Sequence, residues 1–358
     1  MENRGLLFIP DISGFTRFVT ETEINHSRLI IQELLELLIN ANEINLEVSE
    51  IEGDAILFYR YGESPDLREV YRQVEKMFCE FHKHIGFYEI SRFCQCKACL
   101  SAVKLTLKII THYGEFAGYN VKNFSKLIGK DVIVAHQLLK NDIGQHEYWL
   151  VTDELLQHHE PAGLANWMQW NNSAKKTETG EISFHYTPLT PLKQSITPEV
   201  PLQLELAEKV KMISLSRDYP VHIIRLFHAT GDFNYRSRWQ EGVRTVEEIN
   251  HFLPRLGMKC RVVKEGGQSV ITHSSYSFTP EKIVFSETDE KKKQATYYTL
   301  ERINDKTTRL TLDYYIQKNL IDETMFELFR KRSITNELKK SMENLEQVAK
   351  EINVSTEY

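Results

Sequence analysis

Two stretches near the N-terminus each place an aspartate at the end of an apolar strand. Residues 6–16 form an apolar run that ends in Asp11 and then passes through a Ser-Gly turn into a predicted helix. Residues 47–59 turn at a Gly-Asp pair that contains Asp54 and return as an apolar strand, which predicts a hairpin. Carboxylates on rigid strand ends, beside the free N–H groups of a helix start, favour a site for a divalent cation and a polyphosphate.

Four sequence blocks extend this pattern along the first half of the chain. They are DISGFT at 11–16, EGDAILF at 52–58, ITHYGEF at 110–116 and LIGKDVIVA at 127–135. In their order and approximate spacing, residues 5–190 resemble the catalytic domain of class III nucleotidyl cyclases, the adenylyl and guanylyl cyclases. The resemblance implies a ferredoxin-like α+β domain over residues 1–190, with a central sheet and covering helices, that works as a homodimer.

The resemblance also implies a purine nucleoside triphosphate and two ions of Mg²⁺ or Mn²⁺ as ligands. The metal ligands would be Asp11, Asp54 and the backbone carbonyl of Ile12. The nucleotide contacts would come from the turns: Ser13, Gly14, Phe15, Thr16 and Gly53. The alternative is that Asp11 caps the following helix and Asp54 completes a turn, because both are common roles of aspartate.

Two further positions correspond to the residues that read the base in this family. Glu50, three residues before the hairpin glycine, matches the Glu of guanylyl cyclases, whereas adenylyl cyclases carry Lys there. Lys126, three residues before Gly129, matches neither the Cys of guanylyl cyclases nor the Asp of adenylyl cyclases. The pair therefore leans only weakly towards guanine.

The main departure from the family follows Gly129. The resemblance requires an Asn four residues and an Arg eight residues beyond it, both acting on the transition state, but Ile133 and Gln137 stand there. Glutamine lacks the charged, forked donor set of arginine, and isoleucine has no donor. Losing one preorganised donor typically costs about 10²–10³ in rate, so we expect nucleotide binding with doubtful turnover and leave enzyme activity open.

A compact group of thiols follows a helix that the apolar spacing predicts over residues 65–86. Cys94, Cys96 and Cys99 lie within six residues, a spacing that allows Zn²⁺ binding or redox chemistry. Structural zinc normally has four protein ligands, and the fourth is not evident from the sequence. Its candidates are Cys79, His82, His84 and His112. Inert, half-buried thiols are the alternative.

The second half of the chain shows a different order of elements. A proline-rich linker over 191–204 leads to a domain over 205–358, with one strand, short helices near 220–227 and 245–253, an antiparallel run and a final helix over 322–352. This order resembles the helix-grip fold of START-like, polyketide-cyclase-like (SRPBCC) proteins, reinforced by RSRWQEGVRTVEEI and LGMKCRVV. The resemblance implies a cavity for an apolar small molecule. Its candidate lining residues are Arg238, Trp239, His273, Tyr276 and Tyr314.

Composition excludes some functions. The net charge of −6 argues against a nucleic-acid binder, and no apolar stretch reaches the roughly 18 residues of a membrane span. The absence of a signal-peptide pattern and of a disulfide framework leads us to expect a cytoplasmic protein. Three functions stay open: a divergent cyclase with a ligand-responsive domain, an inactive nucleotide or ligand sensor, and an apolar-ligand carrier whose cyclase-like half is a dimerisation scaffold.

Overall fold

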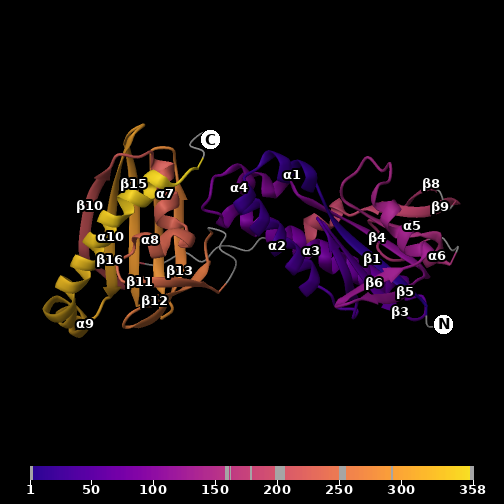
Figure 1. Ribbon diagram of the computed structural model, residues 1–358, viewed down its shortest axis with the longest axis horizontal. Helices are drawn as coiled ribbons and strands as arrows, with labels where there is room; N and C mark the ends of the chain where they lie inside the picture. The colour runs from indigo at the N-terminus through magenta and orange to yellow at the C-terminus, as the bar shows by residue number, and fades with distance from the viewer. Residues whose placement is uncertain are drawn as a thin grey trace. The chain divides into compact units, whose positions relative to one another are not determined.

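The computed structural model describes residues 3–157, 161, 163–177, 180–197, 206–249, 255–291 and 293–354. The chain divides into two compact units (Figure 1). The first comprises Met1–Gly86 and Ser101–Glu199, and the second comprises Phe87–Leu100 and Val200–Tyr358.

The first unit is built on a seven-stranded sheet in the order β2-β3-β1-β4-β7-β9-β8. Its strands are β1 (Arg4–Ser13), β2 (Glu47–Glu52), β3 (Ala55–Tyr61), β4 (Thr106–Glu115), β7 (Tyr148–Thr152), β8 (Asn171–Thr177) and β9 (Gly180–Pro188). β4 and β7 run parallel, and the other neighbouring strands run antiparallel. A separate hairpin joins β5 (Ala117–Val121) to β6 (Phe124–Ile128).

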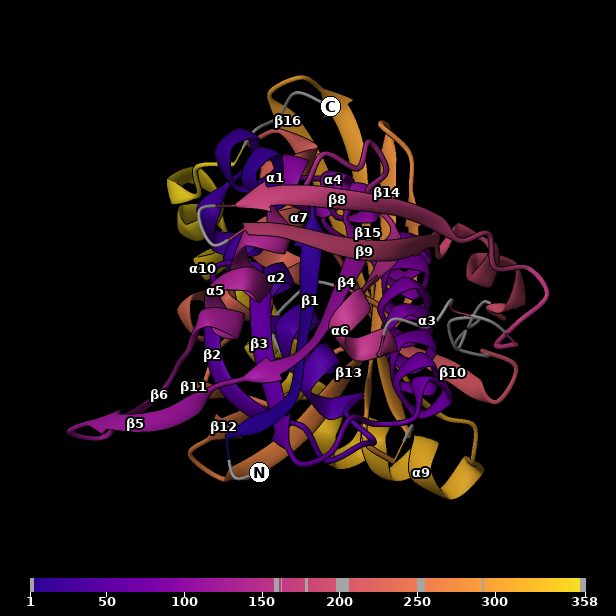
Figure 2. The same cartoon turned by 90° about the vertical axis from the view of Figure 1, so that its right-hand side faces the viewer.

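Helices cover both faces of this sheet. They are α1 (Phe15–Glu21), α2 (Ile24–Asn40), α3 (Leu67–Ser91), α5 (Lys130–Leu139) and α6 (Asp153–Leu156), with a 3₁₀ turn at Thr190–Ser195. Figures 1 and 2 place α2 and α3 on one side and α5 and α6 on the other. Leu7 and Ile9 of β1 pack with Val134 and Leu138 of α5. Alternate side chains of a strand point to opposite faces, so β1, buried from Gly5 to Ser13, is anchored from both sides.

The second unit contains a seven-stranded antiparallel sheet in the order β10-β16-β15-β14-β13-β12-β11. Its strands are β10 (Lys209–Tyr219), β11 (Val243–Glu248), β12 (Lys259–Lys264), β13 (Gly267–Phe278), β14 (Lys282–Asp289), β15 (Gln294–Asn304) and β16 (Thr307–Gln317). Its helices are α7 (Ile223–Gly231), α8 (Arg236–Trp239), α9 (Leu320–Met325) and α10 (Lys331–Glu351), with a 3₁₀ turn at Phe233–Tyr235 and a π-helical turn at Phe326–Arg330.

The last helix packs its apolar stripe into the core of the second unit. Met342, Leu345 and Val348 of α10 are buried in one cluster with Ile213 and Leu312 of the sheet. The Tyr219 hydroxyl donates to the Met342 carbonyl at 2.7 Å. The predicted α+β class and the long C-terminal helix are confirmed.

The helix predicted over 245–253 is wrong where the structure describes it. Residues 243–248 form β11, which pairs with β12, and residues 250–253 lie outside the described part. A bulge between Val243 and Thr245 shifts the register, and Val243 and Val246 both pack against Met258 and Val262. A bulge inserts one extra residue into a strand. Val243 and Val246, three residues apart, therefore lie on the same face of the strand, and a spacing of three is also what a helix shows.

Residues Phe87–Leu100, which we call the strap, pack with the second unit, whereas the sequence prediction placed them in the first domain. Phe93 is fully buried in the core of the second unit. Its ring stacks on Tyr276 with centroids 4.6 Å apart, and the Tyr276 hydroxyl donates to the Phe93 carbonyl at 2.8 Å. The Leu256 N–H donates to the Ser91 carbonyl at 2.8 Å. Long-range packing therefore decides where this segment lies.

Within the described ranges, none of the helices combines the length and the apolar character that crossing a bilayer requires.

Candidate functional site

Asp11 and Asp54 lie on neighbouring strand ends and line the same cavity. Asp11 of β1 pairs with Ala55 of β3, directly after Asp54, and the Ile12 N–H donates to the Asp54 carbonyl at 3.1 Å. The cavity has a volume of about 860 Å³. Two antiparallel strands thus hold both residues at one opening of the first unit.

The turns beside the two aspartates supply further walls of this cavity. Ser13, Gly14, Phe15 and Thr16 line it, whereas Ile12 and Gly53 are not among its lining residues. Gly14 has a φ of +91° and Gly53 a φ of +62°, a left-handed conformation that glycine adopts readily. The first hydrogen bond of α1 runs from the Phe18 N–H to the Gly14 carbonyl, so the amides of residues 15 and 16 precede the helical ladder.

The two carboxyl groups are electrostatically strained. Asp11 is only 9% exposed, and burial raises its pKa, an effect that nearby Lys108 opposes. Burial, and then the charge of Asp11, raise the pKa of Asp54 to about 6. A cation bound between the two acids would oppose both pKa shifts, because a positive charge favours the ionised form of each carboxyl group.

Sequence reasoning missed Lys108. In the register of β1 and β4, Lys108 stands directly opposite Asp11, and its ammonium lies 3.4 Å from the Asp11 carboxylate. The same ammonium donates to the Leu139 carbonyl at 3.0 Å. The alternation of residues 103–110 predicts a strand with Lys104, Thr106 and Lys108 on its polar face, but it does not indicate which residue lies opposite Lys108.

Helix α5 forms the opposite wall. Ile133 and Gln137, which stand where the resemblance requires Asn and Arg, both line the cavity, as do His136 and Lys140. The His136 ring lies 3.7 Å from the Glu52 carboxylate. Sequence reasoning also did not select two further cavity residues, Arg17 and His146. The wall is therefore basic, but the two matched positions are uncharged.

Glu50 and Lys126, the predicted base-reading pair, contact each other. The Lys126 ammonium donates to the Glu50 carboxylate, and His136 Nε2 lies 3.6 Å from the other Glu50 oxygen. Neither Glu50 nor Lys126 is among the residues that line the cavity. In this state, each of the two side chains is engaged by the other.

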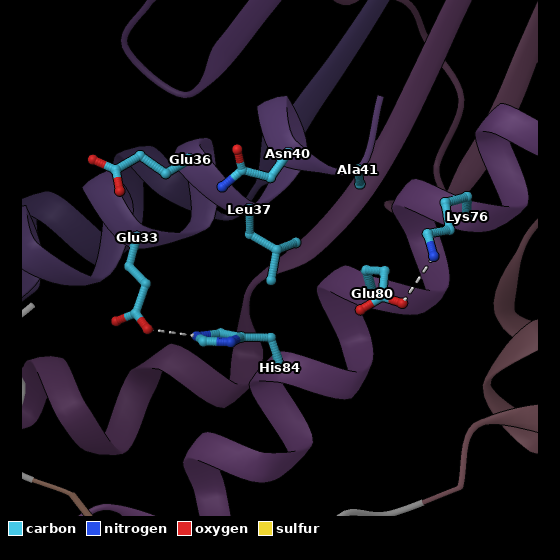
Figure 3. Close-up of a pocket in the computed structure, with 8 residues that line it drawn as sticks. All are labelled: Glu33, Glu36, Leu37, Asn40, Ala41, Lys76, Glu80 and His84. Atoms are coloured by element: carbon cyan, nitrogen blue, oxygen red, sulfur yellow. Dashed lines mark ion pairs between the residues drawn. The ribbon is translucent and has the colours of Figure 1, made fainter. Parts of the chain in front are cut away.

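A second groove of the first unit lies between α2 and α3 (Figure 3). His84 Nε2 lies 3.3 Å from the Glu33 carboxylate, and Lys76 lies 3.4 Å from Glu80. Figure 3 shows the Glu33 carboxylate directed at the His84 ring and the Lys76 ammonium directed at the Glu80 carboxylate. In this groove, these acids face basic side chains of α3.

The three predicted thiols converge on the strap. The sulfur atoms of Cys94, Cys96 and Cys99 lie within 4.8 Å of one another. All five cysteines lie within the described residues, and none forms a disulfide. Burial raises the pKa of the Cys94 thiol well above its usual value, which disfavours the redox alternative because the thiolate is the reactive form.

The four predicted candidates for a further thiol-site ligand have partners in the first unit. His84 pairs with Glu33, and His82 Nε2 lies 3.6 Å from Glu147. His112 Nδ1 and the Thr152 hydroxyl are 2.8 Å apart. Cys79 has its pKa raised by burial and is hydrogen-bonded to Ser195.

Of the residues predicted to line an apolar cavity, Tyr314 lines a cavity of about 240 Å³ in the second unit. Trp239 and His273 are buried, and His273 stacks on Phe233 with ring centroids 4.2 Å apart. The Tyr276 hydroxyl donates a hydrogen bond to the Phe93 carbonyl of the strap, and Arg238 forms an ion pair with Glu351 at the surface. These four residues are not among those that line this cavity, and the apolar ligand stays a prediction.

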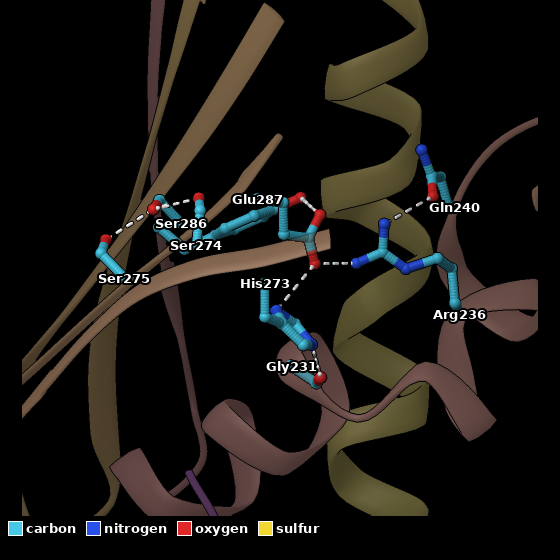
Figure 4. A network of polar contacts seen from close by, with 9 residues as sticks. Gly231, Arg236, Gln240, His273, Ser274, Ser275, Ser286 and Glu287 are labelled. Carbon is cyan, nitrogen blue, oxygen red and sulfur yellow. Dashed lines mark hydrogen bonds and ion pairs between the residues drawn. The ribbon is translucent and has the colours of Figure 1, made fainter. Parts of the chain in front are cut away.

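Arg236 and Glu287 also line that cavity and form a buried ion pair that was not predicted. Arg236 and Glu287 are 1% and 4% exposed, and the Arg236 guanidinium donates to the Glu287 carboxylate. Figure 4 shows the guanidinium and the His273 ring directed at the same carboxylate. The Tyr298 hydroxyl donates to its second oxygen at 3.2 Å. Burial and the charge of Arg236 lower the pKa of His273 well below its usual value, so this ring is neutral.

Comparison with protein families finds one match. Residues 31–148 match a family described as "Protein of unknown function (DUF2652)". This range includes Asp54 and the three strap cysteines but not Asp11. A curated relative, the uncharacterized protein Rv2561/Rv2562 of Mycobacterium tuberculosis, is 31% identical over 134 residues. That alignment covers 35% of this chain and 58% of the relative, less than two thirds of its length.

Among solved structures, the chain resembles nucleotidyl cyclase catalytic domains. One is the guanylate cyclase domain of a protein from Catenaria anguillulae, solved in complex with GTP: 11% identity, 52% of this chain and 96% of that one, and a TM-score of 0.36. Another is a bacterial light-regulated adenylyl cyclase: 15% identity, 54% of this chain and 97% of that one, and a TM-score of 0.38. At TM-scores below 0.5, these likenesses alone assign no activity to the chain.

Proposed function

We propose that the first unit binds a purine nucleoside triphosphate with a divalent cation, Mg²⁺ or Mn²⁺, as a divergent homodimeric cyclase-like protein with slow or absent cyclisation. The observation that carries the proposal is that Asp11 of β1 and Asp54 of the turn between β2 and β3 line one cavity of about 860 Å³. Caps and turns explain each aspartate separately, but they do not explain why two like charges share a cavity.

The residues present fit the implied cation. Mg²⁺ and Mn²⁺ prefer carboxylate and carbonyl oxygens, and burial followed by the charge of Asp11 raises the pKa of Asp54 to about 6. When bound, such an ion neutralises the charge of the phosphates. Arg17, Lys108 and Lys140 add positive charge to the walls for the same anionic group.

Slow turnover follows from the wall that α5 forms. Ile133 and Gln137 occupy cavity positions, so the lack of a charged donor there cannot be explained by their facing elsewhere. Each missing donor typically lowers the rate by about 10²–10³. We therefore expect this chain to hold the triphosphate and to convert it poorly.

The test measures binding and product formation separately. A fluorescent GTP or ATP analogue is titrated into the protein with Mn²⁺ and with chelator, and the same samples are assayed for cyclic nucleotide and pyrophosphate. We expect cation-dependent binding with little product. Asp54→Ala should lose binding, whereas Asp142→Ala, at an exposed site outside the cavity, should retain it. Binding that is absent, or unchanged by Asp54→Ala, would overturn the proposal.

A further inference from the structure

We propose that Cys94, Cys96, Cys99 and His228 bind one Zn²⁺ ion, which fastens the strap to the second unit. The four residues all belong to this unit. This site shares no residue with the cavity of Asp11 and Asp54. A negative result for one proposal therefore does not affect the other.

The three thiols lie close together, and one of them contacts His228. The three sulfur atoms lie within 4.8 Å of one another, and Cys94 Sγ lies 3.7 Å from His228 Nε2. Zn–S distances of about 2.3 Å and Zn–N distances of about 2.0–2.1 Å place tetrahedral S and N ligands about 3.6 Å apart. The Cys94–His228 pair therefore has the separation of two ligands of one ion.

Each of the three sulfur atoms accepts a hydrogen bond from a group on the same segment of the chain. The Cys96 N–H donates to Cys94 Sγ at 3.4 Å, and the Cys99 N–H donates to Cys96 Sγ at 3.5 Å. The Tyr88 hydroxyl donates to Cys99 Sγ at 2.9 Å. Hydrogen bonds from a second layer orient metal ligands and stabilise their charge. Three donors directed at three sulfur atoms exceed what inert thiols require.

The ligand set favours zinc over the harder cations. Thiolate sulfur with imidazole nitrogen is the donor set of structural zinc sites, whereas Mg²⁺ and Ca²⁺ take oxygen. On binding, Zn²⁺ replaces the three thiol protons, which leave to solvent, and the neutral imidazole donates its nitrogen lone pair. No electron transfer is involved, and the site then carries a net charge of −1.

The position of the site suggests what the ion does. Cys94 directly follows Phe93, the side chain that the strap buries in the core of the second unit. His228 belongs to α7, which also contributes Phe227 to that core. An ion shared by strap and helix would cross-link residues 134 positions apart in the sequence. While the ion stays bound, this cross-link lowers the conformational entropy of the unfolded chain. It therefore stabilises the folded state, as a disulfide does.

The experiment uses the full-length protein. Metal content is measured by mass spectrometry after purification without chelator, and chelator-treated protein is titrated with Co²⁺, whose absorption bands report thiolate ligation and tetrahedral geometry. We expect about one Zn²⁺ per chain and a thiolate–Co²⁺ spectrum, as for other structural zinc sites. Cys96→Ser and Cys99→Ser should lose both, while Cys79→Ser and Cys260→Ser, outside the cluster, should retain both.

Two measurements keep the test decisive if a variant fails to fold. In the wild-type protein, chelator should expose three additional thiols to a thiol reagent and speed proteolysis within the strap. His228→Gln should lower Co²⁺ affinity by on the order of tenfold or more, unlike His222→Asn at the start of α7. Unchanged binding in His228→Gln would refute the histidine ligand. A wild-type protein that takes up neither Zn²⁺ nor Co²⁺ would overturn the whole proposal.

Discussion

Asp11 and Asp54 form one group of partly or fully buried charged side chains, and Arg236 and Glu287 form another. The first group brings two like charges together, whereas the second pairs opposite charges. Glu287 receives Arg236 and Tyr298 within hydrogen-bonding distance, and both members of the ion pair are nearly inaccessible. Asp11 and Asp54 instead face an open cavity beside one another, with Lys108 as the cation nearest to Asp11.

The difference separates a structural charge from a binding charge. A buried charge that finds its counter-charge within the fold stabilises one packing arrangement and needs no ligand. At the edge of the cavity, burial and then the charge of Asp11 raise the pKa of Asp54, and a bound cation would relieve both effects. The burial of a charged side chain does not by itself identify a binding site. A buried charge whose counter-charge is missing from the fold is the better indication.

The strongest test of this comparison removes the charge of Glu287. Glu287→Gln keeps the size of the side chain but leaves Arg236 uncompensated in the core, so we expect the free energy of unfolding to fall by about 3–5 kcal/mol. Denaturant unfolding measures the change. Glu265→Gln, in the exposed pair with Arg244, should cost less than about 1 kcal/mol. Equal effects of the two substitutions would remove the distinction.

The pH dependence of stability provides an intermediate test. The folded pKa of Asp54, about 6, lies above its ordinary value of 3.8, so the folded state binds more protons than the unfolded state between these values. Without cation, this contribution to stability is present below about pH 3.8 and is lost as the pH rises to 6. Asp54→Asn should flatten that part of the curve, and Mn²⁺ should do so in the wild-type protein. If melting temperatures of wild type and variant run parallel from pH 4 to 7, the coupling of the two acids is absent.

The smallest effect is expected at the Glu50–Lys126 pair. The Lys126 side chain is 42% exposed and contacts Glu50, which is 15% exposed, so exchanging the two residues in Glu50→Lys/Lys126→Glu should change the free energy of unfolding by less than about 1 kcal/mol. The exchange should shift the ratio of GTP to ATP affinity by a few-fold, because it reverses the donor and acceptor presented to the base. Nucleotide competition measures the ratio. An unchanged ratio would mean that the pair is a surface contact without a role in base selection.

Much of the candidate site could be anticipated from local patterns. Apolar runs that end in Asp11 and Asp54, and glycines at the turns, specify strand ends within a few residues of themselves. The same approach gave a helix instead of strand β11. The bulge after Val243 changes the alternation of two that is typical of a strand into a spacing of three. Lys108 was missed because its importance arises from the residue opposite it on β1, and no pattern within β4 indicates that partner.

By itself, the sequence determined the α+β class, the long final helix, the two strand-end acids and the clustering of the thiols. Tertiary structure decided that the strap joins the second unit, that Cys94 meets His228, and that Arg236 meets Glu287. Periodicity and turn propensity act over neighbouring residues, so they can be read directly. Register and long-range pairing depend on how the whole core packs, because each such contact must repay the entropy of closing the chain between its partners.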